Sequence, residues 1–246
     1  MNPLLLHIES ATEVCSIAVS RGLEVIGFTE TTEAYQHASR MTLLIEETMH
    51  QAGYALKDLD GVSVSLGPGS YTSLRVGFST AKGICYALDK PMVVVSTLEA
   101  LAATAKLETE RSRRESPTGH PLAKSAFAPS YYIPMIDARR MEVYTAIYNQ
   151  EMDCVVAPYA LVIEKEVFEP QLAEGAQLFL CGNGAPKCKT ILQHPNIHFL
   201  AVGCSARHLV TLANRAFEQK QFVDIAYTEP FYLKPPNITL SKKKVF

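Results

Sequence analysis

Residues 62–77 read VSVSLGPGSYTSLRVG, a stretch in which two kinds of secondary structure meet. The first five residues alternate between apolar and polar side chains, which is typical of a β-strand. The Gly-Pro-Gly turn that follows ends the strand, and Ser70 or Thr72 can cap a helix by accepting a backbone N–H. A strand that passes through a short turn into a helix predicts an α/β fold.

Two amphipathic helices are predicted near this stretch. One runs from about Thr72 to about Leu88, and the other from Gln36 to Ala52. In each helix the apolar or small residues recur with helical spacing and form one stripe. The stripe of the later helix contains Leu74, Gly77, Phe78, Ala81, Ile84 and Leu88, and that of the earlier helix contains Met41, Leu44, Ile45, Thr48, Met49 and Ala52.

The rest of the chain repeats the order of strands followed by helices. Three β-rich runs open the chain and predict an antiparallel meander, and further strands and a late helix follow in both halves. We therefore expect a duplicated α/β plan. The predicted strands are 4–8, 14–20, 24–29, 92–95, 133–136, 142–148 and 178–181, and the late helix is 205–220.

A charged segment separates the two halves. Residues 106–130 combine acidic and basic side chains with prolines and a glycine, and such a composition buries little apolar surface. We interpret it as an exposed insertion between a first lobe, 1–105, and a second lobe, 131–228. Residues 229–246 then form a C-terminal tail.

The overall composition limits the possible functions. The chain has 246 residues with 23 basic and 25 acidic side chains, so its net charge gives no reason for it to hold an RNA backbone alone. Three lysines at 242–244 either contact nucleic acid or form a solvated tail. The six cysteines contain no CxxC pair, and no apolar run approaches the roughly 18 residues of a membrane span. We expect a soluble cytoplasmic protein.

Candidate catalytic groups are few. Glu9 ends the first strand at the position where an actin-like ATPase would carry an acid, but the turn after it contains no glycine to wrap a phosphate. His194 and His198 are four residues apart, yet Pro195 between them argues against two metal ligands on one helix. No G-x-S-x-G elbow is present. We therefore predict no catalytic residue, no bound cofactor and no metal.

The segment GPGSYTSLRVG also lacks the features of a nucleotide loop. It matches neither a Walker loop nor a dinucleotide-binding fingerprint. We therefore favour a structural role, in which the turn sets the direction of a helix that packs on the sheet. Arg75, near the start of that helix, is either an ion-pair residue of an interface or a solvated side chain. The two apolar stripes likewise have two interpretations: each belongs either to the core of the chain or to a surface that binds a second protein.

Several segments together resemble the TsaB (YeaZ) family. They are LLLHIESATEVCSIAV, HASRMTLLIEETM, LDGVSVSLGPGSYTSLRVGFSTAKGICYALDKPMVVVSTLEALA, IDARRMEVYTAIY and EPFYLKPP, which cover most of the chain outside the charged insertion. The GPGSxTxxRxG core is the most specific of these. One departure is Glu9, where the family usually has Asp.

This resemblance implies a two-lobed actin-like, Hsp70-like fold with a degenerate nucleotide pocket. It also implies a non-catalytic scaffold that pairs with the catalytic subunit TsaD and the ATPase TsaE to modify tRNA with threonylcarbamoyladenosine. The chain would form a homodimer when alone and would meet tRNA only through the complex. The implied interface consists of Met41, Leu44, Ile45, Thr48, Leu74, Arg75, Gly77, Phe78 and Ala81.

Two alternatives remain at this stage. The chain could be a peptidase or an ATP-dependent small-molecule enzyme of the same fold, which predicts tight binding of ATP or metal by the isolated protein. It could also be a self-associating structural protein outside any RNA pathway.

Overall fold

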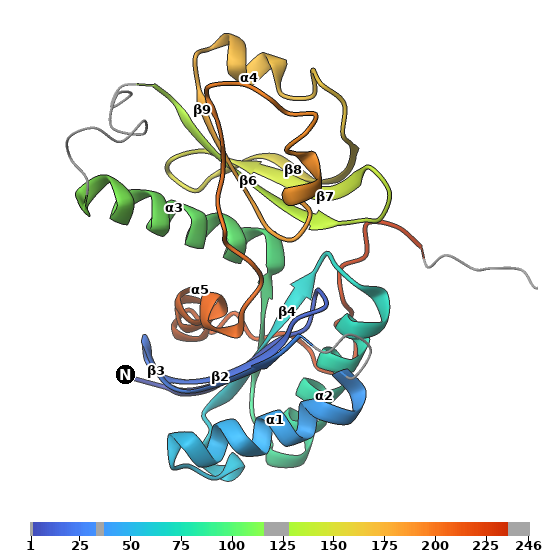
Figure 1. Cartoon of the computed structure of the whole chain (residues 1–246). Helices are drawn as coiled ribbons and strands as arrows, with labels where there is room; N and C mark the ends of the chain where they lie inside the picture. Colours follow the sequence, from blue (N-terminus) through green and yellow to red (C-terminus); the bar gives the residue numbers. More distant parts are fainter. Residues whose placement is uncertain (1, 33–36, 116–127, 236–246) are drawn as a thin grey trace, which may run out of the picture.

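The computed structural model describes residues 2–32, 37–115 and 128–235, which form two α/β lobes (Figure 1). The first lobe contains a five-stranded sheet in the order β3-β2-β1-β4-β5, and the second a five-stranded sheet in the order β10-β9-β6-β7-β8. The strands are β1 (Leu4–Glu9), β2 (Cys15–Arg21), β3 (Glu24–Thr31), β4 (Gly61–Gly67), β5 (Met92–Ser96), β6 (Ser130–Asp137), β7 (Glu142–Tyr148), β8 (Cys154–Val162), β9 (Gln177–Cys181) and β10 (Ile197–Phe199).

Both sheets follow one plan. The first three strands of each lobe form an antiparallel meander, β1 to β3 in one and β6 to β8 in the other. The fourth strand then pairs in parallel with the first, and the fifth pairs in parallel with the fourth. The predicted duplication of an α/β unit is confirmed.

The helices form layers around these sheets. In Figure 1, α1 and α2 cover the outer face of the first sheet, whereas α3 and α5 lie between the two sheets. The chain crosses between the lobes first through α3 and later through the segment that joins β10 to α5. The helices are α1 (His37–Ala52), α2 (Tyr71–Leu88), α3 (Thr97–Glu115), α4 (Glu169–Ala173) and α5 (Ala206–Glu218).

The predicted strands and helices are all present in the described residues, with ends shifted by a few positions. Two strands were not predicted. β8 contains Pro158 and lies at an edge of its sheet, and β10 has only three residues, Ile197–Phe199. Neither carries the regular alternation that identifies a strand.

The predicted insertion at 106–130 is wrong in its first part, because α3 continues through Glu115. Charged pairs on its surface support this extension, with 3.9 Å between Lys106 Nζ and Glu110 Oε1 and 2.8 Å between Arg111 Nε and Glu115 Oε1. Thr109 is buried on the inner side of the helix. Residues 116–127 of the predicted insertion lie outside the described residues.

The first sheet is buried on both faces. Leu4, Leu6 and Ile8 point toward α1 and α2, while the alternate residues of β1 face the layer of α3 and α5. That second face is partly polar: His7 Nδ1 lies 2.7 Å from Ser63 Oγ, and His7 Nε2 lies 2.8 Å from Ser20 Oγ. Among the described helices, none is long and apolar enough to cross a membrane.

Candidate partner interface

The Gly-Pro-Gly turn sets the position of α2. The Ser70 N–H donates to the carbonyl of Ala11 over 2.7 Å, and Ser70 Oγ caps the helix by accepting from the Ser73 N–H at 3.4 Å. A Cβ atom on Gly69 would overlap the Ala11 carbonyl, so only glycine allows this approach. The Gly-Pro-Gly turn therefore holds the start of α2 in contact with the turn between β1 and β2.

The backbone amides of the turn between β1 and β2 are hydrogen-bonded within the protein. The Ala11 N–H donates to Glu9 Oε1 at 2.7 Å, and the Ser10 N–H donates to Ser65 Oγ at 3.2 Å. These amides point inward, whereas a phosphate-binding turn presents them to its ligand. The Glu9 carboxyl is fully buried, and this burial raises its pKa to about 7.

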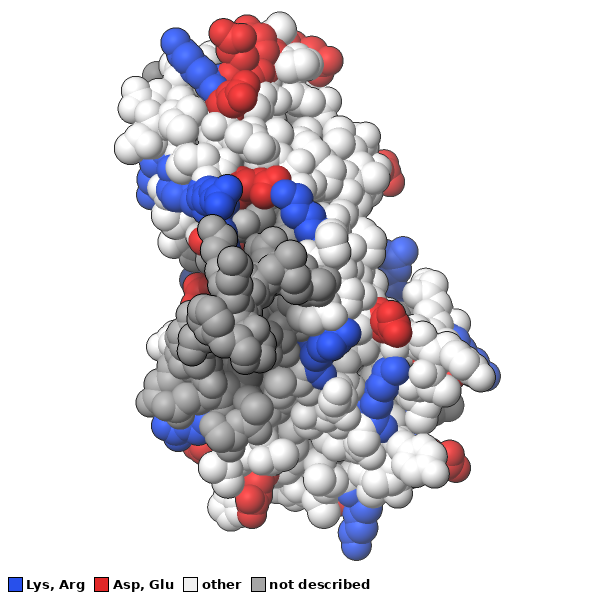
Figure 2. Space-filling model, turned by 90° about the vertical axis from the view of Figure 1, so that its right-hand side faces the viewer, with Lys and Arg blue, Asp and Glu red and all other residues white. Residues whose placement is uncertain are grey.

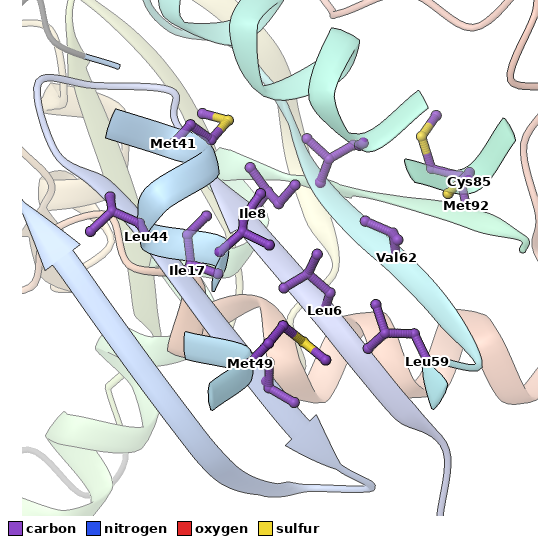
Figure 3. Close-up of a cluster of buried hydrophobic side chains, with 14 of the residues drawn as sticks. Leu6, Ile8, Ile17, Met41, Leu44, Met49, Leu59, Val62, Cys85 and Met92 are labelled. Atoms are coloured by element: carbon purple, nitrogen blue, oxygen red, sulfur yellow. The ribbon is translucent and has the colours of Figure 1, made fainter. Parts of the chain in front are cut away.

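Most of the predicted interface residues lie in the core of the first lobe (Figure 3). Met41 and Leu44 of α1 point toward Leu6, Ile8 and Ile17 of the sheet. The assignment of such buried side chains to a partner surface is therefore corrected, because the folded monomer already covers them; Ile45, although buried, also contributes to the lining of the groove between α1 and α2. The buried members are Met41, Leu44, Ile45, Thr48, Leu74, Gly77, Phe78 and Ala81.

Arg75 is the exposed member of the predicted set. Its guanidinium lies 4.2 Å from the centre of the Tyr71 ring, and the rings of Tyr71 and Tyr232 are 4.6 Å apart. Tyr232 belongs to the segment after α5. Arg75 thus contacts a cluster that holds this late segment against the start of α2.

The outward faces of the two helices carry a different apolar set. Leu43 of α1 is 58% exposed and Tyr86 of α2 is 83% exposed. A groove of about 570 Å³ separates the helices, and Ile45 and Met49 contribute to its apolar lining. The lining residues are Thr42, Ile45, Glu46, Met49, His50, Tyr54, Ala55, Leu56, Thr80 and Ile84.

Sequence reasoning missed Leu43 and Tyr86 because both lie off the periodic stripes. The signal that could have found them is a large apolar residue on the polar side of an amphipathic helix. Within the described ranges, no three histidine, cysteine, aspartate or glutamate side chains are grouped so that they could hold a metal ion.

The duplicated sheets and the helices packed between them define a two-lobed α/β protein of the actin-like, Hsp70-like class. More particularly, the chain belongs to the family described as TsaD, tRNA N6-adenosine threonylcarbamoyltransferase, whose model matches residues 26–239.

Individual relatives extend over almost the entire chain. TsaB of Haemophilus influenzae, a tRNA threonylcarbamoyladenosine biosynthesis protein, is 24% identical over 95% of this chain and 94% of its own length. TsaB of Bacillus subtilis is 25% identical over 94% of this chain and 93% of its own length. The solved structure of YeaZ from Pseudomonas aeruginosa is 25% identical, covers 94% of this chain and 100% of its own, and has a TM-score of 0.72.

Proposed function

We propose that this chain is a cytoplasmic, non-catalytic scaffold subunit in the biosynthesis of threonylcarbamoyladenosine in tRNA. It pairs with a TsaD-like catalytic subunit through the outward faces of α1 and α2, and a TsaE-like ATPase joins this pair. The observation that carries the proposal is the apolar groove between these two helices, together with the exposure of Leu43 on α1 and of Tyr86 on α2. The names of the TsaB relatives support the pathway.

The groove has the properties of a protein-binding surface. Its floor is apolar at Ile45, Met49 and Ile84, while Glu46 and His50 supply a polar rim. Interfaces combine an apolar centre with a polar edge in this way, and an obligate one buries on the order of 2,000 Å² or more. A helix of the partner that inserts an apolar side chain between α1 and α2 would cover the floor of this groove.

The inward direction of the amides near Glu9 supports a scaffold rather than an ATP-dependent enzyme. An enzyme needs donors aimed at the phosphates, and here Ala11 and Ser70 donate their N–H groups to protein oxygens. Calorimetry of the isolated chain with ATP and a divalent metal checks this point. Tight binding with turnover would favour the enzyme alternative.

The distribution of surface charge supports a model in which this chain meets tRNA only as part of the complex. On the face in Figure 2, the described lysine and arginine side chains are interspersed with acidic ones. Such a surface gives little of the electrostatic affinity that RNA binding requires. In the proposed complex, most of that affinity comes from the catalytic partner.

The decisive experiment is co-purification with the TsaD-like subunit. Leu43→Arg places a charge at the edge of the groove, and we expect at least a tenfold loss of complex affinity. Leu107→Arg is the matched control, because Leu107 on α3 is 60% exposed and distant from the groove along the chain. Both substitutions leave the core intact.

Two further readouts complete the test. Mass spectrometry of tRNA nucleosides from a strain that carries only Leu43→Arg should show loss of threonylcarbamoyladenosine, whereas the control strain retains it. Unchanged complex formation by Leu43→Arg, together with a Tyr86→Arg variant that also binds normally, would refute the proposed surface. Substitution of Leu44 or Gly77 is unsuitable here, because both residues are buried in the lobe.

A further inference from the structure

Two polar contacts join the lobes directly. The Nδ2 atom of Asn183, in the turn after β9, donates to the Glu13 Oε2 atom in the turn between β1 and β2 over 2.8 Å. The Lys234 ammonium pairs with the carboxylate of Glu142, the first residue of β7. Together these two contacts form a clasp between the lobes.

The segment that carries Lys234 is held on the first lobe, although it follows α5 in the sequence. The Phe231 N–H donates to the Leu66 carbonyl of β4 over 2.8 Å, and the Tyr232 ring lies 4.6 Å from that of Tyr71 at the start of α2. The ion pair of Lys234 with β7 is therefore a contact between the two lobes.

A network within the second lobe positions its half of the clasp. Asn183 Oδ1 accepts the Asp137 N–H over 3.0 Å, which turns the Nδ2 atom toward Glu13. The Asp137 carboxylate accepts from the Lys187 ammonium, which also donates to the Glu142 carbonyl over 2.6 Å. This network connects Asn183 with Glu142, so the two contacts of the clasp lie on the same side of the second lobe.

The lobes also meet through α3 and α5, which lie between the two sheets (Figure 1). Leu101 of α3 belongs to a core cluster with the second sheet, whereas Leu209 of α5 packs with β5 of the first sheet and with Ala100. Glu99 of α3 is attracted to Arg215 of α5. A cavity of about 300 Å³ remains between α3, the start of α5 and the segment before it. Incomplete packing of this kind permits relative motion of two lobes.

We propose that the clasp holds the two lobes closed and that its release lets them open about the contact between α3 and α5. Both contacts of the clasp lie at the surface, and the Lys234 and Glu142 side chains are 45% and 21% exposed. Exposed ion pairs are weak and are screened by salt, so the closed arrangement is readily reversible. The clasp involves neither of the outward helix faces of α1 and α2, and it stands independently of the proposed function.

Asn183 offers a selective way to release the clasp. In Asn183→Asp the oxygen that accepts the Asp137 N–H is kept, but a carboxylate replaces the donor to Glu13, so two like charges face each other. Glu13→Gln in the same chain restores a donor, and the hydrogen bond then runs in the opposite direction. A role of Asn183 confined to the second lobe would not respond to this change in the first lobe.

The test measures the distance between two spin labels on the full chain by pulsed electron paramagnetic resonance. Thr72→Cys, on the exposed side of α2, and Val162→Cys, opposite Glu142 in the β7–β8 ladder, carry the labels. Cys154 is exposed and is replaced by serine, and the other five cysteines are buried. Dilution with unlabelled chain restricts the measurement to distances within one molecule.

We expect Asn183→Asp combined with Lys234→Met to raise the population with the longer distance about fivefold or more, because both contacts are removed. Adding Glu13→Gln should reverse the part that is due to Asn183→Asp. Salt at about 1 M should increase the same population in the parent, because it screens the ion pair of Lys234.

Matched controls remove similar contacts that lie within one element. Asn149→Asp alters a side chain that bonds only to Asp153 in its own turn among the described residues, and Lys106→Met breaks a pair with Glu110 inside α3. Both should leave the distance distribution unchanged.

Three results would overturn the proposal: an unchanged distribution in the double variant, equal opening in the controls, or no closure on addition of Glu13→Gln. Thermal unfolding of each variant checks that both lobes remain folded. The salt measurement requires no substitution in the clasp, so an unchanged parental distribution at about 1 M salt would overturn the proposal even if the double variant did not fold.

Discussion

Gly77 of α2 lies directly against Ser10 of the first turn, so closely that a Cβ atom on Gly77 would overlap the Ser10 hydroxyl oxygen. This contact packs α2 closely against the turn between β1 and β2. The Ser10 Oγ atom is buried without a hydrogen-bond partner among the described residues. Close packing of the helix thus takes precedence over hydrogen bonding of this hydroxyl.

Gly77→Ala should therefore destabilise the fold, although alanine is a better helix former than glycine. Overpacking typically costs about 1–3 kcal/mol, which corresponds to a lower Tm by about 2–12 °C in a chain of this size. Gly83→Ala is the control in the same helix, because a Cβ atom there meets nothing within 4 Å. It should raise stability by about 0.5–1 kcal/mol. Thermal unfolding of both variants measures the difference, and two shifts of equal sign would contradict the contact.

The buried Glu9 carboxyl predicts a dependence of stability on pH. Burial raises the pKa of Glu9 to about 7 from its ordinary value of 4.5, so the folded chain retains a proton that the unfolded chain has lost. The contribution of this group to the free energy of unfolding therefore falls as pH rises from 4.5 to 7, by about 3 kcal/mol. Glu9→Gln removes the ionisable group and with it this loss of stability. The free energy of unfolding of the variant minus that of the parent should therefore increase from pH 5 to pH 8. Denaturant titrations at these two pH values provide the measurement.

The buried His7 ring predicts that the free energy of unfolding changes with pH in the opposite direction. Burial lowers the pKa of His7 to about 3 from 6.5, so below pH 6.5 the unfolded chain binds a proton that the folded chain excludes. Its contribution to stability is present above pH 6.5 and is lost as pH falls toward 3. Between pH 4.5 and 6.5 the slopes of His7 and Glu9 oppose each other. The Glu9→Gln variant should therefore lose stability from pH 6.5 to 4.5 more steeply than the parent. Parallel curves would contradict the assignment of Glu9, and a variant that keeps its stability over this range would contradict that of His7.

The serines of β4 show what an alternating sequence pattern predicts about the structure and what it does not. The alternation in VSVSL correctly predicts a strand, because every second side chain points to the same face. It does not reveal that both faces are buried, since Ser63 and Ser65 are covered and hydrogen-bonded to His7 and to the Ser10 amide. Those partners lie more than fifty residues away in the chain. Hydrogen bonds between distant strands are fixed by topology, which local alternation does not encode.

The helix stripes show a related limit for the candidate site. The spacing of Met41, Leu44 and Ile45 correctly predicts α1 and the direction of its apolar face. Spacing cannot tell whether a sheet of the same chain or a second protein covers that face. The sheet does, and the large apolar side chains that remain exposed on the two helices are Leu43 and Tyr86, which break the pattern. Regular spacing thus predicts the buried face of a helix, whereas irregular apolar positions identify the apolar side chains that stay exposed.

The last prediction concerns self-association through the same groove. The family resemblance implies a homodimer when the catalytic partner is absent, and we expect the two copies to meet through the outward faces of α1 and α2. Tyr86→Ala removes the most exposed aromatic ring on α2, and we expect the dimer dissociation constant to rise at least tenfold in sedimentation equilibrium. Leu23→Ala is the control, because Leu23 is 69% exposed in the turn between β2 and β3. Equal dimer stability in the two variants would place self-association on another surface. Addition of the TsaD-like subunit should convert the parental dimer to the mixed complex, because both partners compete for Leu43 and Tyr86.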